Sequence, residues 1–285
     1  MKIKKKYRIL CLILAVAVLG VGIGYVLSRG DWWFYLEQTF RIYSEPDLKI
    51  PLRDETSREW TLAELMQAEG VTVSKLLMLV NSSHPLPVGY EAELEEYGGA
   101  LMHPLMIAPY IALKDAVYQR TGVKIYVSSD YRTREEQESI LAESEDGVAA
   151  QIGCSEHEAG MALDVYAPYH AGMEFLKSEA GREVNRICCE YGYVIRYPHG
   201  KEDVTGIAYE PWHLRYVGAP HAKIMADSGL TLEEYIEYLT PETWYESGEY
   251  LILRTEKNTV SMPAEWETCS ISPDNTGYTI ITVKR

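Results

Sequence analysis

Cysteine is scarce in this chain of 285 residues, which has five of them. Cys11 lies in an apolar run near the N-terminus, and the others are Cys154, Cys188, Cys189 and Cys269. No two of them form a C-x-x-C pair, which argues against a thiolate zinc site, and the number is too small for a disulfide scaffold. We expect the adjacent pair at 188–189 to be buried as small apolar residues of a helix.

Positive charge is also sparse beyond the first 30 residues. The chain holds 27 Lys and Arg against 42 Asp and Glu, a formal net charge of −15. Since the first 30 residues carry six bases and no acid, the remainder carries −21. A body this acidic repels polyphosphate, which argues against nucleic acid as a partner. The apolar share of 47% and the charged share of 24% exclude a disordered, collagen-like or multi-span membrane protein.

One long run without charge covers residues 9–27. As a helix with a rise of about 1.5 Å per residue it measures roughly 28 Å, close to the thickness of a bilayer's hydrocarbon core. The basic flank at 1–8 predicts a cytoplasmic N-terminus, and Trp32, Trp33 and Phe34 suit the opposite membrane interface. The alternative is a cleaved signal peptide, although the run is too long for one and lacks a small-x-small cleavage site. We therefore predict a single-pass cell-membrane protein whose folded part is extracytoplasmic.

The chain length allows one substantial domain with extra segments. We divide the rest of the chain into a juxtamembrane and short helical segment at 28–78, a main domain at 79–240 and a small β appendage at 241–285. Helical spacing and capping residues predict helices at 60–69, 73–80, 106–120, 133–143, 174–191 and 231–239. Apolar runs and alternation predict strands at 123–128, 161–166, 193–197 and 206–217, and within the appendage at 250–254, 266–271 and 279–283.

An acidic residue, Asp164, interrupts the apolar strand predicted at 161–166. A carboxylate in such surroundings costs several kcal/mol unless it is paired or binds a metal. His157 lies seven residues earlier, and His213 lies downstream. Two imidazoles and one carboxylate suit Zn²⁺ with an open position for water, and Glu210 would then serve as the general base. Taken one at a time, each of these residue types is more often structural.

Two segments carry these residues in a recognisable spacing, Ser155-x-His157-x-x-Gly160-x-Ala162-x-Asp164 and Glu210-Pro-Trp-His213. In combination they resemble the VanY-type D-alanyl-D-alanine carboxypeptidases, which belong to a group of zinc D,D-peptidases with lysostaphin-like relatives. The resemblance covers about 79–240, and it extends to the segments 80–87, 129–137, 196–206, 214–218 and 230–235.

The resemblance implies a role for each of these residues. The zinc ligands are matched by three side chains: His157, Asp164 and His213. Glu210 matches the catalytic base. Arg132 matches the arginine that holds the substrate and polarises the scissile carbonyl, which suits a permanently charged, planar guanidinium. Ser129, Gln137 and Ser155 match polar positions that line the substrate pocket.

The family also implies an α+β fold of the hedgehog/D,D-peptidase type, in which a small antiparallel sheet bears the zinc site and helices surround it. To this core the chain adds the N-terminal membrane helix and the small C-terminal β appendage. Two positions depart from the family pattern. Asp130 stands in place of a glycine and puts a negative charge two residues from Arg132, and Cys154 follows a changed approach to Ser155.

We therefore expect a membrane-anchored zinc carboxypeptidase that removes the C-terminal D-alanine from peptidoglycan stem peptides. Its substrate would be a lipid-linked precursor or nascent wall, and it would act as a monomer and deplete the target of glycopeptide antibiotics. A serine D,D-peptidase is excluded because no lysine has a serine three residues before it. Two alternatives stay open, an L,D-carboxypeptidase acting on tetrapeptide stems and a non-catalytic wall-binding module with a vestigial zinc site.

Overall fold

The computed structural model describes residues 20, 22, 24, 30–50, 58–143 and 150–285. Apart from three of its positions, the span predicted at 9–27 lies outside the described residues. Within the described ranges, no helix has both the length and the apolar character needed to cross a membrane. The membrane anchor therefore stays a prediction.

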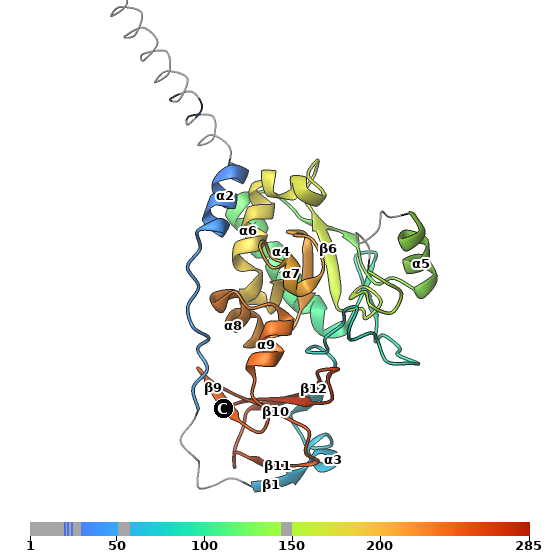
Figure 1. The fold of residues 1–285 in the computed structure, drawn as a ribbon, viewed down its shortest axis with the longest axis vertical. Helices are drawn as coiled ribbons and strands as arrows, with labels where there is room; N and C mark the ends of the chain where they lie inside the picture. The colour runs from blue at the N-terminus through green and yellow to red at the C-terminus, as the bar shows by residue number, and fades with distance from the viewer. Residues whose placement is uncertain (1–19, 21, 23, 25–29, 51–57, 144–149) are drawn as a thin grey trace, which may run out of the picture.

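A four-stranded sheet lies at the centre of the larger part of the molecule (Figure 1). In spatial order its strands are β5 (Tyr126–Ser129), β6 (Ala162–Tyr166), β8 (His213–Tyr216) and β7 (Tyr193–Ile195). Each neighbouring pair is antiparallel. A separate hairpin of β3 (Glu95–Tyr97) and β4 (Ala100–Met102) precedes the first long helix. The α+β class expected from the sequence is confirmed, with the predicted small antiparallel sheet at its centre.

Helices pack against this sheet and bury its apolar side chains. The longest is α4 (Pro104–Thr121), which contacts α6 (Glu179–Ile187). The core that they share with β6 includes Leu113, Val117, Leu163, Val165 and Val184. The other helices are α5 (Arg134–Glu143), α7 (Glu202–Thr205), α8 (His221–Ser228) and α9 (Leu232–Tyr238). The helices predicted at 106–120, 133–143 and 231–239 are thus confirmed to within two residues.

The single helix predicted over 174–191 is wrong. The structure breaks it into a 3-10 helix η1 (Gly172–Lys177), α6 and a second 3-10 helix η2 (Cys188–Tyr191). The break falls at Ser178, which is extended and whose hydroxyl accepts a 2.8 Å hydrogen bond from the Gly181 amide. Serine is a favoured N-cap, so it starts a new helix here. A Cβ at Gly181 would lie 2.0 Å from the Phe175 carbonyl oxygen, so the close turn requires glycine.

A second unit, which we call the β module, combines residues 58–73 with 244–284. Its five-stranded sheet has the order β2 (Val71–Val73), β12 (Thr268–Pro273), β13 (Thr279–Lys284), β10 (Tyr250–Thr255) and β9 (Trp244–Ser247). A two-stranded ribbon of β1 (Arg58–Thr61) and β11 (Thr259–Met262) lies beside it, with the short helix α3 (Leu62–Leu65). The three strands predicted in the C-terminal appendage are confirmed.

The helix predicted at 73–80 is wrong, and the one predicted at 60–69 is reduced to α3. Residues 71–73 instead form β2, which pairs in parallel with β12. Their Val-Thr-Val sequence favours a strand because β-branched side chains pack well on a pleated surface. Helix α3 keeps the capping box of Thr61 and Glu64. The segment before residue 79 therefore supplies strands to the β module, whereas the proposed boundaries at 78 and 240 stay predictions.

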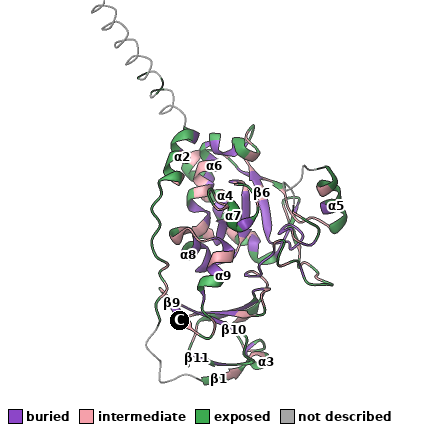
Figure 2. Cartoon of the chain, viewed as in Figure 1, coloured by how far each residue is buried: buried purple, intermediate pink, exposed green. Residues whose placement is uncertain are grey.

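The central strands β10 and β13 of the five-stranded sheet are buried along most of their length, and β10 is purple in Figure 2. One face of β10 and β13 contributes Leu251, Leu253 and Ile281 to a core within the β module. The other face contributes Ile252 and Ile280 to a core shared with α8 and α9. Successive residues of a strand point to opposite faces, so one stretch of sequence serves both cores. The β module is therefore packed firmly on the larger domain.

The N-terminal part of the described chain lies along the outside of the domain (Figure 1). Helix α2 (Gly30–Thr39) contacts η1 and α6, and it buries Phe34 completely. Trp32 and Trp33 remain 51% and 55% exposed. The extended segment 40–50 follows and reaches the β module, where Lys49 bridges to Glu246 of β9.

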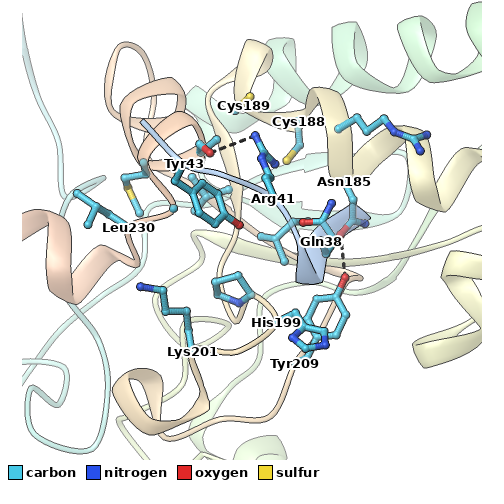
Figure 3. A pocket seen from close by; sticks show the side chains of 17 residues that line it. Gln38, Arg41, Tyr43, Asn185, Cys188, Cys189, His199, Lys201, Tyr209 and Leu230 are labelled. Carbon is cyan, nitrogen blue, oxygen red and sulfur yellow. Dashed lines mark hydrogen bonds between the residues drawn. The ribbon is translucent and has the colours of Figure 1, made fainter. Parts of the chain in front are cut away.

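A pocket lies between this N-terminal segment and the domain. Arg41 and Tyr43 of the N-terminal segment line it together with Cys189, His199 and Tyr209 of the domain (Figure 3). Arg41 donates a hydrogen bond to the Ala226 carbonyl at 3.3 Å. The expectation that residues 188–189 are buried holds for Cys188, whereas Cys189 is partly exposed at this pocket.

Candidate metal centre and active site

Three residues distant in sequence meet on the central sheet. Asp164 of β6 and His213 of β8 are direct partners in the antiparallel register, so their side chains leave neighbouring strands side by side. His157 lies in the turn that leads into β6, where the Gly160 amide donates to the His157 carbonyl at 3.0 Å. Gly160 has a φ of +72°, and a Cβ there would lie 2.8 Å from a Leu94 methyl group, which explains the glycine of the motif.

The ligand atoms of His157, Asp164 and His213 all lie within 4.8 Å of one another. Asp164 Oδ1 is 3.0 Å from His213 Nδ1 and 3.4 Å from His157 Nε2. The His157 Nε2 atom is buried, and no hydrogen-bond partner for it occurs in the described part of the chain. A buried nitrogen lone pair without a hydrogen-bond donor, beside a carboxylate and a second imidazole, fits a Zn²⁺ ion. Cys154 does not belong to this group.

The electrostatics of the three groups reflect their mutual contacts. Burial alone would raise the pKa of Asp164, but the adjacent imidazoles of His157 and His213 hold it far below its ordinary value. Burial tends to lower the pKa of His213, yet its bonds to Asp164 and Glu156 raise it to about 9. Burial lowers the pKa of His157. A metal ion can bind His213 only through a neutral imidazole nitrogen, so metal binding at this site is coupled to the loss of a proton from that ring.

Glu210 lies in the turn directly before β8. Its carboxylate Oε2 is 3.7 Å from His213 Nδ1, and its amide donates to the Tyr197 carbonyl at 3.0 Å. Burial raises the pKa of Glu210 above its ordinary value, as befits a proton acceptor near neutral pH. The strand predicted over 206–217 is wrong for its first half, because Pro211 cannot donate to a ladder and β8 begins only at His213. The turn at Pro211 brings Glu210 and His213 to the same site.

Arg132 approaches the same centre from the loop after β5. Its NH2 group lies 3.9 Å from Asp164 Oδ2. Its Nε donates to Ser129 Oγ at 3.2 Å and its NH1 to Gln137 Oε1 at 2.8 Å, so two predicted pocket residues hold the guanidinium. Gln137 is fully buried and donates to the Ala150 carbonyl. The structure thus brings Ser129, Arg132 and Gln137 together, while their roles toward a substrate stay predictions.

Ser155 is buried two residues before the first histidine, and its role as a pocket residue also stays a prediction. Asp130, which departs from the family pattern, accepts a 2.5 Å hydrogen bond from the Leu101 amide through its carboxylate. Its backbone carbonyl lies 2.7 Å from His157 Nδ1. The sequence drew attention to the charge of Asp130, whereas its main contact with the centre is made by the main chain.

Sequence reasoning missed a group of buried charges behind the centre. Glu156, Arg196 and Arg215 are buried with side chains that are 0% exposed. Arg215 stands between Leu214 and Tyr216 of β8, so a charged residue within a buried strand was the signal available for it.

Comparison with known proteins places these residues in a family. The model of the VanY D-alanyl-D-alanine carboxypeptidase family matches residues 100–219, which include all four residues predicted as zinc ligands or base. A D-alanyl-D-alanine carboxypeptidase of Enterococcus faecium is 31% identical over 258 residues, 80% of each chain. The chain belongs to the VanY family. As a member of this family it is a zinc-dependent D,D-carboxypeptidase, with His157, Asp164 and His213 as its candidate metal site.

Solved structures of VanY relatives agree with this assignment. The D,D-pentapeptidase VanY from the VanB-type resistance cassette, a Glu-to-Ala mutant in complex with Zn(II), is 32% identical and covers 56% of this chain and 98% of its own, with a TM-score of 0.52. The vancomycin resistance D,D-dipeptidase VanXYg, bound to a D-Ala-D-Ala phosphinate analogue, is 27% identical and covers 80% of this chain and 98% of its own, with a TM-score of 0.63.

Proposed function

We propose that this protein removes the C-terminal D-alanine from peptidoglycan stem peptides, at the outer surface of the cell membrane. The observation that carries the proposal is the partly buried Glu210 carboxylate, 3.7 Å from His213 Nδ1 and beside three converging candidate metal ligands. A binding module needs no acid–base group at that point. The names of the relatives in the VanY family support the same peptide class.

The residues of the chain divide the chemistry between them. His157, Asp164 and His213 would hold a zinc ion, which when bound would supply a water with a pKa of about 7. Glu210 accepts the proton of the attacking water and delivers it to the leaving amine of D-alanine. Arg132, held by Ser129 and Gln137, provides a fixed positive charge for the scissile carbonyl oxygen or the terminal carboxylate.

The test is the variant Glu210→Ala, assayed for D-alanine release from a pentapeptide that ends in D-Ala-D-Ala. General acid–base groups contribute about 10²–10⁴-fold, so we expect a loss of that size with zinc content retained. Glu202→Gln, an exposed carboxylate of α7, is the matched control and should keep wild-type activity. Unchanged activity of Glu210→Ala would refute the assigned role.

The same assay with a tetrapeptide that ends in a single D-alanine decides the stereochemical preference. Release of D-alanine from the pentapeptide alone supports D,D-carboxypeptidase activity. Release from the tetrapeptide alone would reassign the protein as an L,D-carboxypeptidase that uses the same metal site. Both arms are run with and without a chelator, because each of these activities requires the metal.

We further propose that residues 9–27 anchor the enzyme in the membrane with its domain outside. Support comes from the apolar run itself and from Trp32 and Trp33 of α2, whose exposed indoles suit the lipid headgroup region. Fractionation of cells and gel mobility of the mature protein test this. A protein that is shorter by about 30 residues and free of the membrane fraction would refute the anchor. With the enzyme so placed, its removal should raise sensitivity to a glycopeptide antibiotic.

A further inference from the structure

A carboxylate lies behind the metal centre, on the side away from the ligand group. Glu156 is completely buried, and its Oε2 lies 3.5 Å from His213 Nε2. Its Oε1 accepts hydrogen bonds of 2.6 Å from both Arg196 Nε and Arg215 NH1. Glu156 thus joins a metal-ligand candidate to two buried cations.

The two ring nitrogens of His213 face different partners. Nδ1 lies 3.0 Å from Asp164 Oδ1, on the side of the metal ligands, whereas Nε2 faces Glu156. A metal on Nδ1 requires its lone pair, so the ring hydrogen must then be on Nε2, where the Glu156 carboxylate accepts it. His157 shows the complementary arrangement, because its Nδ1 lies 2.7 Å from the Asp130 carbonyl and leaves Nε2 for a metal.

Glu156 is itself held in place from two directions. Arg215 NH2 donates to the backbone carbonyls of Leu76 at 3.0 Å and Met78 at 2.8 Å, which tie it to the chain leaving β2. Arg196 forms two hydrogen bonds with Glu233 of α9, at 2.9 Å and 2.6 Å. The hydrogen bonds from Arg196 Nε and Arg215 NH1 both end on Oε1, which leaves Oε2 of Glu156 to face His213.

We propose that Glu156 is a positioning residue of the metal centre, which holds the His213 imidazole so that its Nδ1 stays directed toward the candidate ligands Asp164 and His157. The guanidinium of Arg215 fixes the carboxylate against the backbone of residues 76–78. The inference concerns the zinc ligands alone and is read out by metal binding. It therefore stands or fails independently of which peptide the enzyme cleaves.

The experiment compares two variants that remove the same charge from the same cluster. Glu156→Gln and Glu233→Gln each take one carboxylate from Arg196, but only Glu156 contacts His213. Zinc affinity is measured on the full-length protein by competition with a chromophoric chelator, and the visible spectrum of the Co²⁺-substituted protein reports the geometry of the ligands. Thermal unfolding of the metal-free proteins shows whether each variant is folded.

We expect Glu156→Gln to weaken zinc binding by about 10–100-fold and to change the Co²⁺ spectrum. Glu233→Gln should change zinc affinity by less than about threefold, although both variants lower the unfolding temperature of the metal-free protein. Equal losses of zinc affinity in the two variants would overturn the proposal, because a general loss of charge balance would then explain them. Unchanged affinity in Glu156→Gln would overturn it too.

Glu156→Asp serves if the glutamine variant does not fold. It keeps the negative charge between the two arginines but withdraws the carboxylate from His213 by one methylene. We expect zinc binding to weaken and the Co²⁺ spectrum to change in this variant, with the unfolding temperature of the metal-free protein closer to wild type. Wild-type zinc affinity in Glu156→Asp would show that the imidazole is positioned without this contact.

Discussion

His221 makes the contact between the domain and the β module sensitive to acid. The ring is buried, with Nδ1 2.7 Å from the Tyr235 hydroxyl and Nε2 2.9 Å from the Thr282 hydroxyl. These elements, α8, α9 and β13, meet in the shared apolar core. Burial lowers the pKa of His221 to about 3. The folded protein therefore holds this imidazole neutral, while the unfolded chain binds a proton near pH 6.5.

The sign of the effect follows from linkage. Because the folded pKa lies below the unfolded one, the unfolded state takes up more protons as the pH falls, and stability is lost between about pH 6.5 and pH 3. At pH 5 the penalty from this one group is about 2 kcal/mol, since each pKa unit corresponds to about 1.4 kcal/mol. The pKa of His221 in the folded protein is about two units below pH 5, so the folded imidazole is neutral there. The size of the penalty therefore depends on the pKa of the unfolded chain.

His221→Gln tests this magnitude. The glutamine amide offers one donor and one acceptor, as the neutral imidazole does, but it does not titrate. We expect the variant to be less stable than wild type at pH 7 and to lose about 2 kcal/mol less between pH 7 and pH 5. Urea unfolding of the metal-free proteins at pH 7 and pH 5 gives the loss of unfolding free energy for each protein. Carboxylates are common to both proteins, so their contribution cancels when the two losses are subtracted. Identical losses in the two proteins would refute the reasoning.

Three further perturbations probe the site and the fold. Arg132→Lys removes the planar fork that is held by two pocket side chains, and D-alanine release should fall by about a hundredfold in kcat/KM with zinc content unchanged. Asp164→Asn removes the carboxylate ligand, and dialysed protein should retain less than a tenth of the wild-type zinc, as measured by atomic absorption. Gly181→Ala places a methyl group 2.0 Å from the Phe175 carbonyl oxygen and should cost about 2 kcal/mol or more in urea unfolding.

Local features of the sequence predicted the parts of the fold that depend on near neighbours. The capping box of Thr133 and Glu136 is present before α5, and that of Thr231 and Glu234 before α9. Each involves residues three apart, so its geometry is set by the helix itself. The failures have two causes. The strand at 71–73 forms by pairing with the distant strand β12, and the helix predicted over 174–191 is divided at Ser178, whose N-cap starts α6.

The metal ligands were predictable because their spacing in the chain matches a family, and the structure brings those three side chains together on β6, β8 and the preceding turn. Local pattern also indicated the helices and the C-terminal strands. Only the tertiary structure decided what surrounds the ligands: the Asp130 carbonyl behind His157 and the Glu156 carboxylate behind His213. Hydrogen bonds between distant segments depend on how the whole chain packs, and no residue type or spacing along the sequence specifies them in advance.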